Sequence, residues 1–419
     1  MPDNSPPATA APPLPRRPAP VPVSLPRQRS AAAHGAGTRR IRPLGAMDRD
    51  VLVLYALTRL GVWITAYCSG RMFSGDGSAK HAPTMLSRWQ QWDWAYYLHI
   101  ARDGYFTGPG AGGAPTTDNR EAFFPGFPLL LRGVHDVLLP DWTAAGLLIS
   151  FVAGAVAVLA LARIARPYLP DDGGGTDAVL FLLLSPCAVF LAAGYTEALF
   201  LALALPCWLA ARKGHWAPAA VLACAATAVR VSGLFLAAAL LVHFLTCGRA
   251  VRGSWWRLPW LALPALPALG YTWYLEARTG DWMAWKHAEE RGWYRQFHSP
   301  WQAWGHTWDA AFSHAQSTPY AVLFQGELVA MVVGVALLGL LLWRRQWAEA
   351  AYLGLTLWAL GTSYWYMSIP RATLLWWPLW VLLARWGARR AWLKTAYVAV
   401  CAPLMTVLTV AFTSGRWAG

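Results

Sequence analysis

The sequence predicts an all-α polytopic membrane protein, on three observations. Hydrophobic residues make up 56% of the 419 residues, where a soluble domain has roughly 45–50%. Charged residues make up only 13%, where about 25% is usual. Apolar runs recur along the chain, and short basic clusters separate them. Because backbone polar groups in a bilayer must be bonded within the protein, such runs are typical of transmembrane helices, and we expect a single membrane domain.

The N-terminal segment, residues 1–48, has a different composition from the rest of the chain. It is rich in Pro, Ala and Arg and shows no apolar periodicity, which is typical of a segment that cannot bury enough apolar surface to fold. We expect a disordered cytoplasmic tail, followed by a membrane domain over residues 49–419. The tail lacks the apolar region and cleavage site of a signal peptide. Met47, just before the first apolar run, leaves a second translation start open.

The apolar runs predict about eleven membrane spans. Several runs are shorter than the roughly 20 residues that a straight crossing needs, so the count is approximate. The expected spans are 50–68, 142–163, 178–194, 197–211, 216–230, 232–246, 258–276, 320–343, 349–366, 372–388 and 395–413.

Basic clusters fall in alternate short loops between these spans. They are Arg163 with Arg166, Arg212 with Lys213, Arg249 with Arg252 and Arg257, Arg344 with Arg345, and Arg389 with Arg390 and Lys394. The positive-inside rule makes these loops cytoplasmic. Two large loops, 69–141 and 277–319, then lie on the extracytoplasmic side with the short turns near 194–197, 230 and 368–371. The charged residues expected on that face are Asp93, Glu197, Arg230, Asp281 and Arg371.

Charge and cysteine content exclude several other classes of protein. The net charge of +14 is spread over the short basic clusters that set the membrane topology, so we expect no nucleic-acid binding. The six cysteines lack CxxC spacing and predict neither a disulfide framework nor a metal site. The spacings of His287, His298 and His306 fit no standard metal-ligand set. The sequence predicts no metal ligands and leaves a divalent-metal requirement open.

The polar, aromatic stretch 88–105 is the strongest candidate for chemistry. Asp93 lies between Trp92 and Trp94, and a carboxylate partly removed from water there could act as a general base. The alternative is a solvated Asp in a loop that tryptophans anchor at the membrane surface. Residues 96–105 have helical spacing, with Tyr97, Ile100 and Ala101 on one side, so we expect an amphipathic helix lying on the membrane.

Three further segments carry unusual polar or aromatic residues. Two prolines in 121–132 predict a kinked re-entrant or interfacial segment, although plain loop packing explains them equally well. Glu197 and Arg230 interrupt apolar runs, which indicates either a functional cavity or a structural ion pair. Arg230 and Arg371 have the guanidinium geometry that suits a phosphate group. The tryptophans of 279–301 could stack on a sugar or anchor the loop at the interface.

At these residues the chain resembles the PIG-V type mannosyltransferases, membrane glycosyltransferases of the GT-C class that take a sugar from a polyprenyl-phosphate carrier. The resemblance extends over about residues 49–419 and rests on six pieces in the same order. They are Trp92-Asp93 with 97–105, Phe123 to Leu130, Ser185-Pro186 with Gly194 to Phe200, Arg230 to Gly233, Thr279 to Asp281, and Pro370-Arg371. Two departures concern the acceptor: Tyr96 stands where the eukaryotic glycolipid-anchor enzymes have histidine, and Gly126 replaces a bulkier residue.

The resemblance implies a GT-C type bundle that transfers a hexose, with mannose expected, from a polyprenyl or dolichyl phosphate sugar. The acceptor would be a hydroxyl of a glycolipid, glycan or protein, with inversion at the anomeric carbon. It implies two catalytic residues, Asp93 and Glu197, with Asp93 as the base. The substrate-binding residues that it implies are Trp92, Tyr105, Tyr195, Arg230, Asp281 and Arg371.

Two other classes of protein remain as alternatives. A transporter or lipid flippase would also carry intramembrane charges, but its expected signature is a pair of symmetry-related broken helices, and the sequence has no internal repeat. A non-catalytic scaffold would give the charges on one face no purpose. The abundance of Ala, Arg, Gly and Trp, with little Lys, predicts a bacterial plasma-membrane protein; a eukaryotic one would lie in the endoplasmic reticulum.

Overall fold

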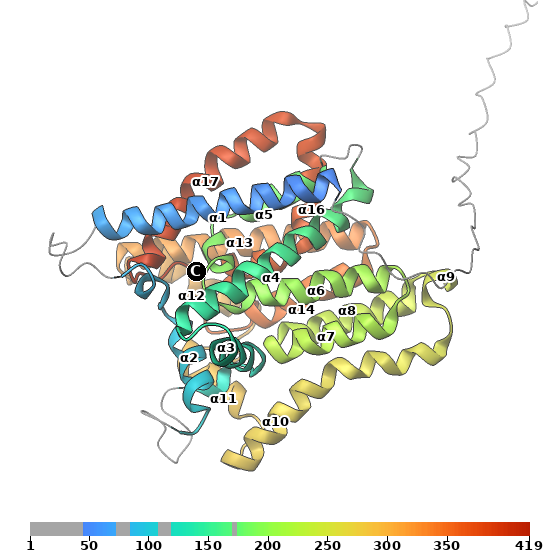
Figure 1. Ribbon diagram of the computed structural model, residues 1–419, viewed down its shortest axis with the longest axis horizontal. Coiled ribbons are helices and arrows are strands. Elements are labelled where there is room, and N and C mark those ends of the chain that lie inside the picture. Colours follow the sequence, from blue (N-terminus) through green and yellow to red (C-terminus); the bar gives the residue numbers. More distant parts are fainter. Residues whose placement is uncertain (1–44, 73–83, 108–118, 170–173) are drawn as a thin grey trace, which may run out of the picture. The chain divides into compact units, whose positions relative to one another are not determined.

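The computed structural model describes residues 45–72, 84–107, 119–169 and 174–419. All regular elements in these ranges are helices (Figure 1). The α-helices are α1 Ala46–Met72, α2 Asp93–Asp103, α3 Gly126–Val137, α4 Trp142–Ala165, α5 Gly174–Leu183, α6 Thr196–Arg212, α7 Trp216–Val229, α8 Ser232–Thr246, α9 Arg249–Arg252, α10 Leu266–Thr279, α11 Ala284–Trp293, α12 Pro300–Phe312, α13 Thr318–Trp343, α14 Trp347–Gly361, α15 Ile369–Ala372, α16 Trp377–Arg389 and α17 Ala391–Thr413. The all-α prediction is therefore confirmed for the described residues.

Four helical segments of the described chain are long and apolar enough to cross a membrane. They are Ala46–Met72, Trp142–Tyr168, Thr318–Trp343 and Ala391–Thr413. The shorter apolar helices α7 and α8 correspond to the expected spans 216–230 and 232–246, whereas α5 covers only the first part of the expected span 178–194. The chain is a multi-pass membrane protein; the count of about eleven spans stays a prediction.

Several expected boundaries differ from the helices, because prolines and polar residues divide the apolar runs. The expected span 258–276 begins as a 3₁₀ segment, Trp255–Ala265, and becomes α-helical only in α10. Pro259 and Pro264 lie within that segment, and a proline has no N–H to donate to a regular helix. At the other end of the chain, α1 begins at Ala46, inside the expected tail. The rest of that tail, residues 1–44, lies outside the described residues.

The core is formed by helices distant in sequence. Helix α6 packs between α4 and α7, α8 packs against α14, and α1 packs against both α4 and α17. At one end of α4, α2 contacts α3 and α3 contacts α4 (Figure 1). Helix α6 begins and α7 ends near this end of the core, so the short turns expected on one face are brought together there.

Two segments of the first large loop differ from their predicted form. The apolar side of α2 packs against protein and not against lipid, since Tyr97 and Ala101 belong to the main core. The segment 121–132, for which a kinked re-entrant or interfacial segment or plain loop packing was expected, is helical from Gly126: Gly126–Val137 forms helix α3, with Pro125 before it and Pro128 in its first turn. Prolines are tolerated there because the first turn of a helix has no N–H groups bonded within the helix.

Candidate active site

Four of the charged residues predicted to share one face form a continuous ion network. Asp93 is the first residue of α2, and Glu197 is the second residue of α6. Arg230 follows α7 directly, and Arg371 lies in the short helix α15. Their chain separations reach 278 positions, so tertiary packing alone brings them together.

Arg371 lies between the two carboxylates of this network. Its Nη1 donates to Oδ2 of Asp93 at 2.6 Å, and its Nε donates to Oε1 of Glu197 at 2.7 Å. Arg230 contacts the same Glu197 oxygen through Nη1 and also donates to Oγ1 of Thr196 at 2.8 Å. The order along the network is therefore Asp93, Arg371, Glu197, Arg230.

Burial differs sharply along the network. Glu197 is fully buried, and Arg371 and Asp93 are 5% and 8% exposed, whereas the Arg230 side chain is 25% exposed. Two carboxylates balance two guanidinium groups, which lowers the cost of removing these charges from water. Arg230 is the member of the network most open to a bound molecule.

The guanidinium of Arg371 is held in its charged state by its neighbours. Burial alone would lower the pKa of Arg371, but the carboxylates of Glu197 and Asp93 raise the pKa well above its ordinary value. The guanidinium also lies over the rings of Phe190 and Tyr195, at 4.6 and 4.9 Å from their centroids. Cation–π contacts of this kind are stronger in desolvated surroundings.

Unusual backbone conformations stand beside both partners of the Asp93–Arg371 pair. Trp92, directly before Asp93, has φ 49°, and Ser368, three residues before Arg371, has φ 67°. Positive φ is uncommon for residues other than glycine, and such strain is concentrated at functional sites. Here it aims both charged side chains into the network.

Glu327 of α13 fixes the turn that carries Arg371. Its Oε1 accepts from the backbone N–H of Ser368 at 2.6 Å, and its Oε2 accepts from that of Ile369 at 2.8 Å. The side chain is buried in a helix that is otherwise strongly apolar. Glu327 was not among the residues predicted from the sequence, although a lone carboxylate within an apolar run is a signal that identifies it.

The indole of Trp94 fixes α2 against the entrance to α6. A methyl group on Gly146 would lie 2.5 Å from Cζ3 of the Trp94 ring, and one on Gly194 would lie 2.6 Å from the same atom. The Cζ3 edge of the ring thus lies against two backbones that only glycine allows so close. Trp94 follows Asp93, and Gly194 lies three residues before Glu197, so this contact sets the spacing of the two carboxylates.

A wall of aromatic rings lies one helical turn from Asp93. Tyr96 stacks on Phe123 with ring centroids 4.7 Å apart, and both rings contact Trp293 at 5.5 and 5.3 Å. All three side chains are half-buried. The predicted tryptophan-rich loop therefore reaches α2 through Trp293.

The other predicted substrate-binding residues lie apart from the charge network or are buried beneath it. Tyr195 is fully buried, and its hydroxyl donates to the backbone oxygen of Gln91. Trp92 is exposed and donates through Nε1 to the backbone oxygen of Arg416. Tyr105 belongs to a separate aromatic cluster with Tyr271, where its hydroxyl donates to the backbone of Phe123.

Asp281 does not join the network either. Its Oδ2 lies 2.6 Å from Nδ1 of His287, and its Oδ1 accepts from the backbone N–H of Met283. Burial raises the pKa of Asp281, but His287 and the Met283 N–H outweigh it, so the pKa lies below its ordinary value. This carboxylate shapes its own loop. In the described part of the chain, no group of three or more His, Cys, Asp or Glu side chains is placed to hold a metal ion.

Part of the chain matches a model of a known protein family. Residues 74–252 match the family model described as mannosyltransferase (PIG-V). This segment contains Asp93, Glu197 and Arg230 of the network, but not Arg371.

Individual proteins that are similar to this chain are also named mannosyltransferases. The mouse (Mus musculus) GPI alpha-1,6-mannosyltransferase 2 is 31% identical over 196 residues, which are 44% of this chain and 38% of the mouse protein. The human (Homo sapiens) protein of that name is 32% identical over 162 residues, 36% of this chain and 30% of the human one. The chain thus matches about a third of the length of these curated relatives.

Among solved structures, the chain is similar to ArnT from Cupriavidus metallidurans bound to undecaprenyl phosphate. The TM-score is 0.45 and the sequence identity 14%, with 88% of this chain and 76% of that chain covered.

Proposed function

We propose that this protein is a membrane glycosyltransferase that transfers a hexose, with mannose expected, from a polyprenyl or dolichyl phosphate sugar to an acceptor hydroxyl. One observation carries the proposal: an accessible arginine and a buried, ion-paired aspartate lie in one charge network. The network lies mostly in the segment that matches the mannosyltransferase model. A transferase needs both a base for the acceptor and a cation for the leaving phosphate.

Asp93 is the base in this proposal. Its Oδ2 is bonded to Arg371, which fixes the direction in which Oδ1 can accept a proton from the acceptor hydroxyl. The hydroxyl oxygen then attacks the anomeric carbon while the bond from that carbon to the phosphate oxygen breaks. The electron pair leaves with the lipid phosphate, the proton stays on Asp93, and a single displacement inverts the anomeric configuration.

The two arginines have different roles in this scheme. Arg230 is partly exposed, so we assign it to the phosphate, whose charge develops as the bond to the sugar breaks. Arg371 has little exposed surface and bonds both carboxylates, so we assign it to positioning Asp93. Glu197 is fully buried behind both guanidinium groups, so it too is a positioning residue and not the second catalytic group expected from the sequence.

The half-buried rings of Tyr96, Phe123 and Trp293 suit the apolar face of a sugar. Tyr96 lies three residues after Asp93 on the same helix, and residues at that spacing are neighbours on a helix surface. A sugar on this wall would present its hydroxyl groups toward the carboxylate. We therefore propose that Tyr96, where the glycolipid-anchor enzymes have histidine, contributes to the choice of acceptor.

The proposal includes a GT-C type arrangement of about eleven spans, with the network on the extracytoplasmic side. The four long apolar helical segments and the basic loops support a polytopic bundle of this orientation. Residues 69–141, part of which lies outside the described residues, would form the first extracytoplasmic loop, and 277–319 the second large one. The composition favours a bacterial plasma membrane and glycolipid synthesis there.

A transfer assay tests the function directly. Purified full-length protein in lipid nanodiscs is incubated with radiolabelled polyprenyl-phosphate mannose and a panel of glycolipid, glycan and peptide acceptors, with polyprenyl-phosphate glucose in parallel. We expect transfer from the mannose carrier, with an inverted anomeric configuration in the product. Failure with every carrier and acceptor would refute the proposal and favour the transporter.

A further inference from the structure

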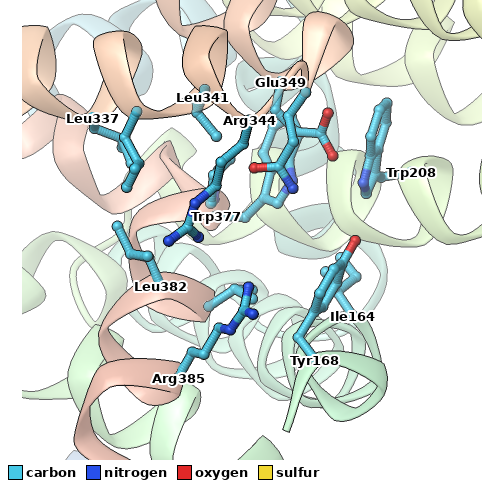
Figure 2. A pocket seen from close by; sticks show the side chains of 14 residues that line it. Ile164, Tyr168, Trp208, Leu337, Leu341, Arg344, Glu349, Trp377, Leu382 and Arg385 are labelled. Carbon is cyan, nitrogen blue, oxygen red and sulfur yellow. The ribbon is translucent and has the colours of Figure 1, made fainter. Parts of the chain in front are cut away.

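A partly polar cavity lies at the opposite end of the helices from the charge network. It is partly open, has a volume of about 40 Å³, and lies between the ends of α4, α13 and α16. Its lining includes Tyr168, Trp208, Arg344, Glu349, Trp377 and Arg385 (Figure 2). Arg344 follows Glu327 by seventeen positions along α13, which corresponds to about 25 Å at 1.5 Å per residue. This cavity is therefore separate from the proposed transferase site.

Two arginines from different helices point into this cavity. Arg344 directly follows α13 and Arg385 lies in α16, and Figure 2 shows their guanidinium groups directed toward the same space. In the described ranges, neither guanidinium has a carboxylate within 4.0 Å. The one carboxylate in the lining, Glu349, lies toward Trp208 (Figure 2).

Within the described part of the chain, two other basic residues near helix ends have a carboxylate partner, which Arg344 and Arg385 do not. Arg163 pairs with Asp48 at 3.1 Å, and Lys394 pairs with Asp177. Burial, and then the positive charges of Arg385 and Arg389, lower the pKa of Arg344. Like charges that face one cavity and have no carboxylate within 4.0 Å repel each other, and a bound anion would relieve that repulsion.

Exposed tryptophans indicate where this cavity lies relative to the bilayer. Trp343 precedes Arg344, Trp386 follows Arg385, and Trp347 begins α14 beside them, and all three are exposed. Tryptophan is enriched at the level of the lipid headgroups. The arginines are therefore at the depth of lipid phosphates, next to the loops that the positive-inside rule makes cytoplasmic.

We propose that this cavity binds the phosphate of an anionic phospholipid headgroup from the cytoplasmic leaflet, between Arg344 and Arg385. Guanidinium groups match phosphate oxygens in geometry and charge, and basic pockets between transmembrane helices suit anionic headgroups. The side chains of Tyr168 and Trp377 complete the walls, and the lipid tails would lie along the apolar outer faces of α13 and α16. The inference does not depend on the transferase function.

The test measures lipid binding by native mass spectrometry on purified full-length protein titrated with phosphatidylglycerol or phosphatidylcholine. We expect preferential binding of phosphatidylglycerol, and a loss of about tenfold or more in its apparent affinity in the double variant Arg344→Gln/Arg385→Gln. The matched control is Arg345→Gln/Arg390→Gln. It removes the same charge from exposed residues that do not line the cavity and should change the affinity by less than about twofold.

Three results would overturn the inference. An equal loss in both double variants would mean diffuse attraction to a basic surface. Equal binding of both lipids would mean that the headgroup charge is not recognised. In a parallel arm, inorganic phosphate at millimolar concentration should not displace phosphatidylglycerol; complete displacement would identify a site for a free anion. Thermal melting of each variant without lipid confirms that it is folded before the comparison is made.

Discussion

The guanidinium of Arg371 donates through Nη1 to Oδ2 of Asp93 at 2.6 Å, joining α2 to a turn 278 positions further along the chain. The same guanidinium bonds Glu197 through Nε. The direction of the Asp93 carboxylate therefore depends on the geometry of Arg371. Because all three groups are buried, the interactions are stronger than they would be in water, and an unpaired member would be costly.

Asp93→Asn should abolish sugar transfer and leave the fold intact. The amide keeps the shape of the carboxylate and can still accept a hydrogen bond from Arg371, but it cannot take a proton from the acceptor. We expect the transfer rate to fall about 10²–10⁴-fold, the range that general acid–base groups contribute. Initial rates with the mannose carrier, and the melting temperature of the variant, measure the two effects.

Asp103→Asn is the matched control for that substitution. Asp103 ends the same helix, its side chain is largely shielded from solvent, and it pairs with Arg102 on the surface. The transfer activity of the Asp103→Asn variant should stay near that of the unmodified protein. If Asp93→Asn were equally active, the assignment of Asp93 as the base would be wrong.

Arg371→Lys should reduce activity although it keeps the positive charge. A lysine has one nitrogen, whereas Arg371 uses Nε for Glu197 and Nη1 for Asp93, so lysine cannot hold both carboxylates in the same geometry. We expect a lower kcat, little change in KM for the donor, and a lower melting temperature. Arg230→Lys gives the contrasting case, since a weakened phosphate contact should raise the KM for the donor as well as lower kcat. If the two variants changed kcat and KM alike, the division of roles between the arginines would be wrong.

The sequence identified the charged members of the network because ionisable residues inside apolar runs are rare enough to be noticed singly. It could not show how they pair, and it grouped Asp281 and Tyr105 with them because a shared face does not specify distance. The contacts of Trp94 could not be predicted either, since nothing in a sequence reveals that Gly146 and Gly194 both lie against the Cζ3 edge of one ring. Pro128 was misread for a local reason: a helix start tolerates the proline that a helix interior does not.

Gly146→Ala should disturb the site from within α4. The added methyl group would lie 2.5 Å from the Trp94 ring, so the indole and α2 must shift. Overpacking of this kind costs about 1–3 kcal/mol in stability. We expect a lower melting temperature together with a loss of activity, because Asp93 is adjacent to the displaced residue.

Gly339→Ala in α13 is the control for a glycine-to-alanine change inside a helix. A methyl group there meets no atom within 4 Å, so the substitution should be neutral or stabilising by up to about 1 kcal/mol. Equal melting temperatures and activities for Gly146→Ala and Gly339→Ala would show that the Trp94 contact is loose enough to adapt.

Gly126→Ala should act on Arg230. A methyl group on Gly126 would lie 2.6 Å from the backbone oxygen of Ala228, near the end of α7, two residues before Arg230. The close contact gives a physical reason for glycine at this position: here α3 and α7 meet backbone to backbone. We expect a raised KM for the lipid-linked donor, measured with the transfer assay at constant acceptor. A KM unchanged from that of the unmodified protein would separate this contact from donor binding.

Glu327→Gln should weaken catalysis without touching the substrate. Each carboxylate oxygen of Glu327 accepts from one backbone N–H of the turn that leads to Arg371. A glutamine has only one accepting oxygen, so one N–H faces the amide nitrogen and loses its partner. An unsatisfied buried donor costs about 1–3 kcal/mol, and the turn should become free to move.

We expect Glu327→Gln to lower kcat with little change in donor KM, because Arg371 would hold Asp93 less firmly. Glu349→Gln, in the cavity at the opposite end of the helices, removes a half-buried carboxylate away from the site and should leave kcat unchanged. A purely structural role for Glu327 would lower the melting temperature while the folded fraction kept its full kcat, and active-site titration of the folded enzyme distinguishes that result from a loss of positioning.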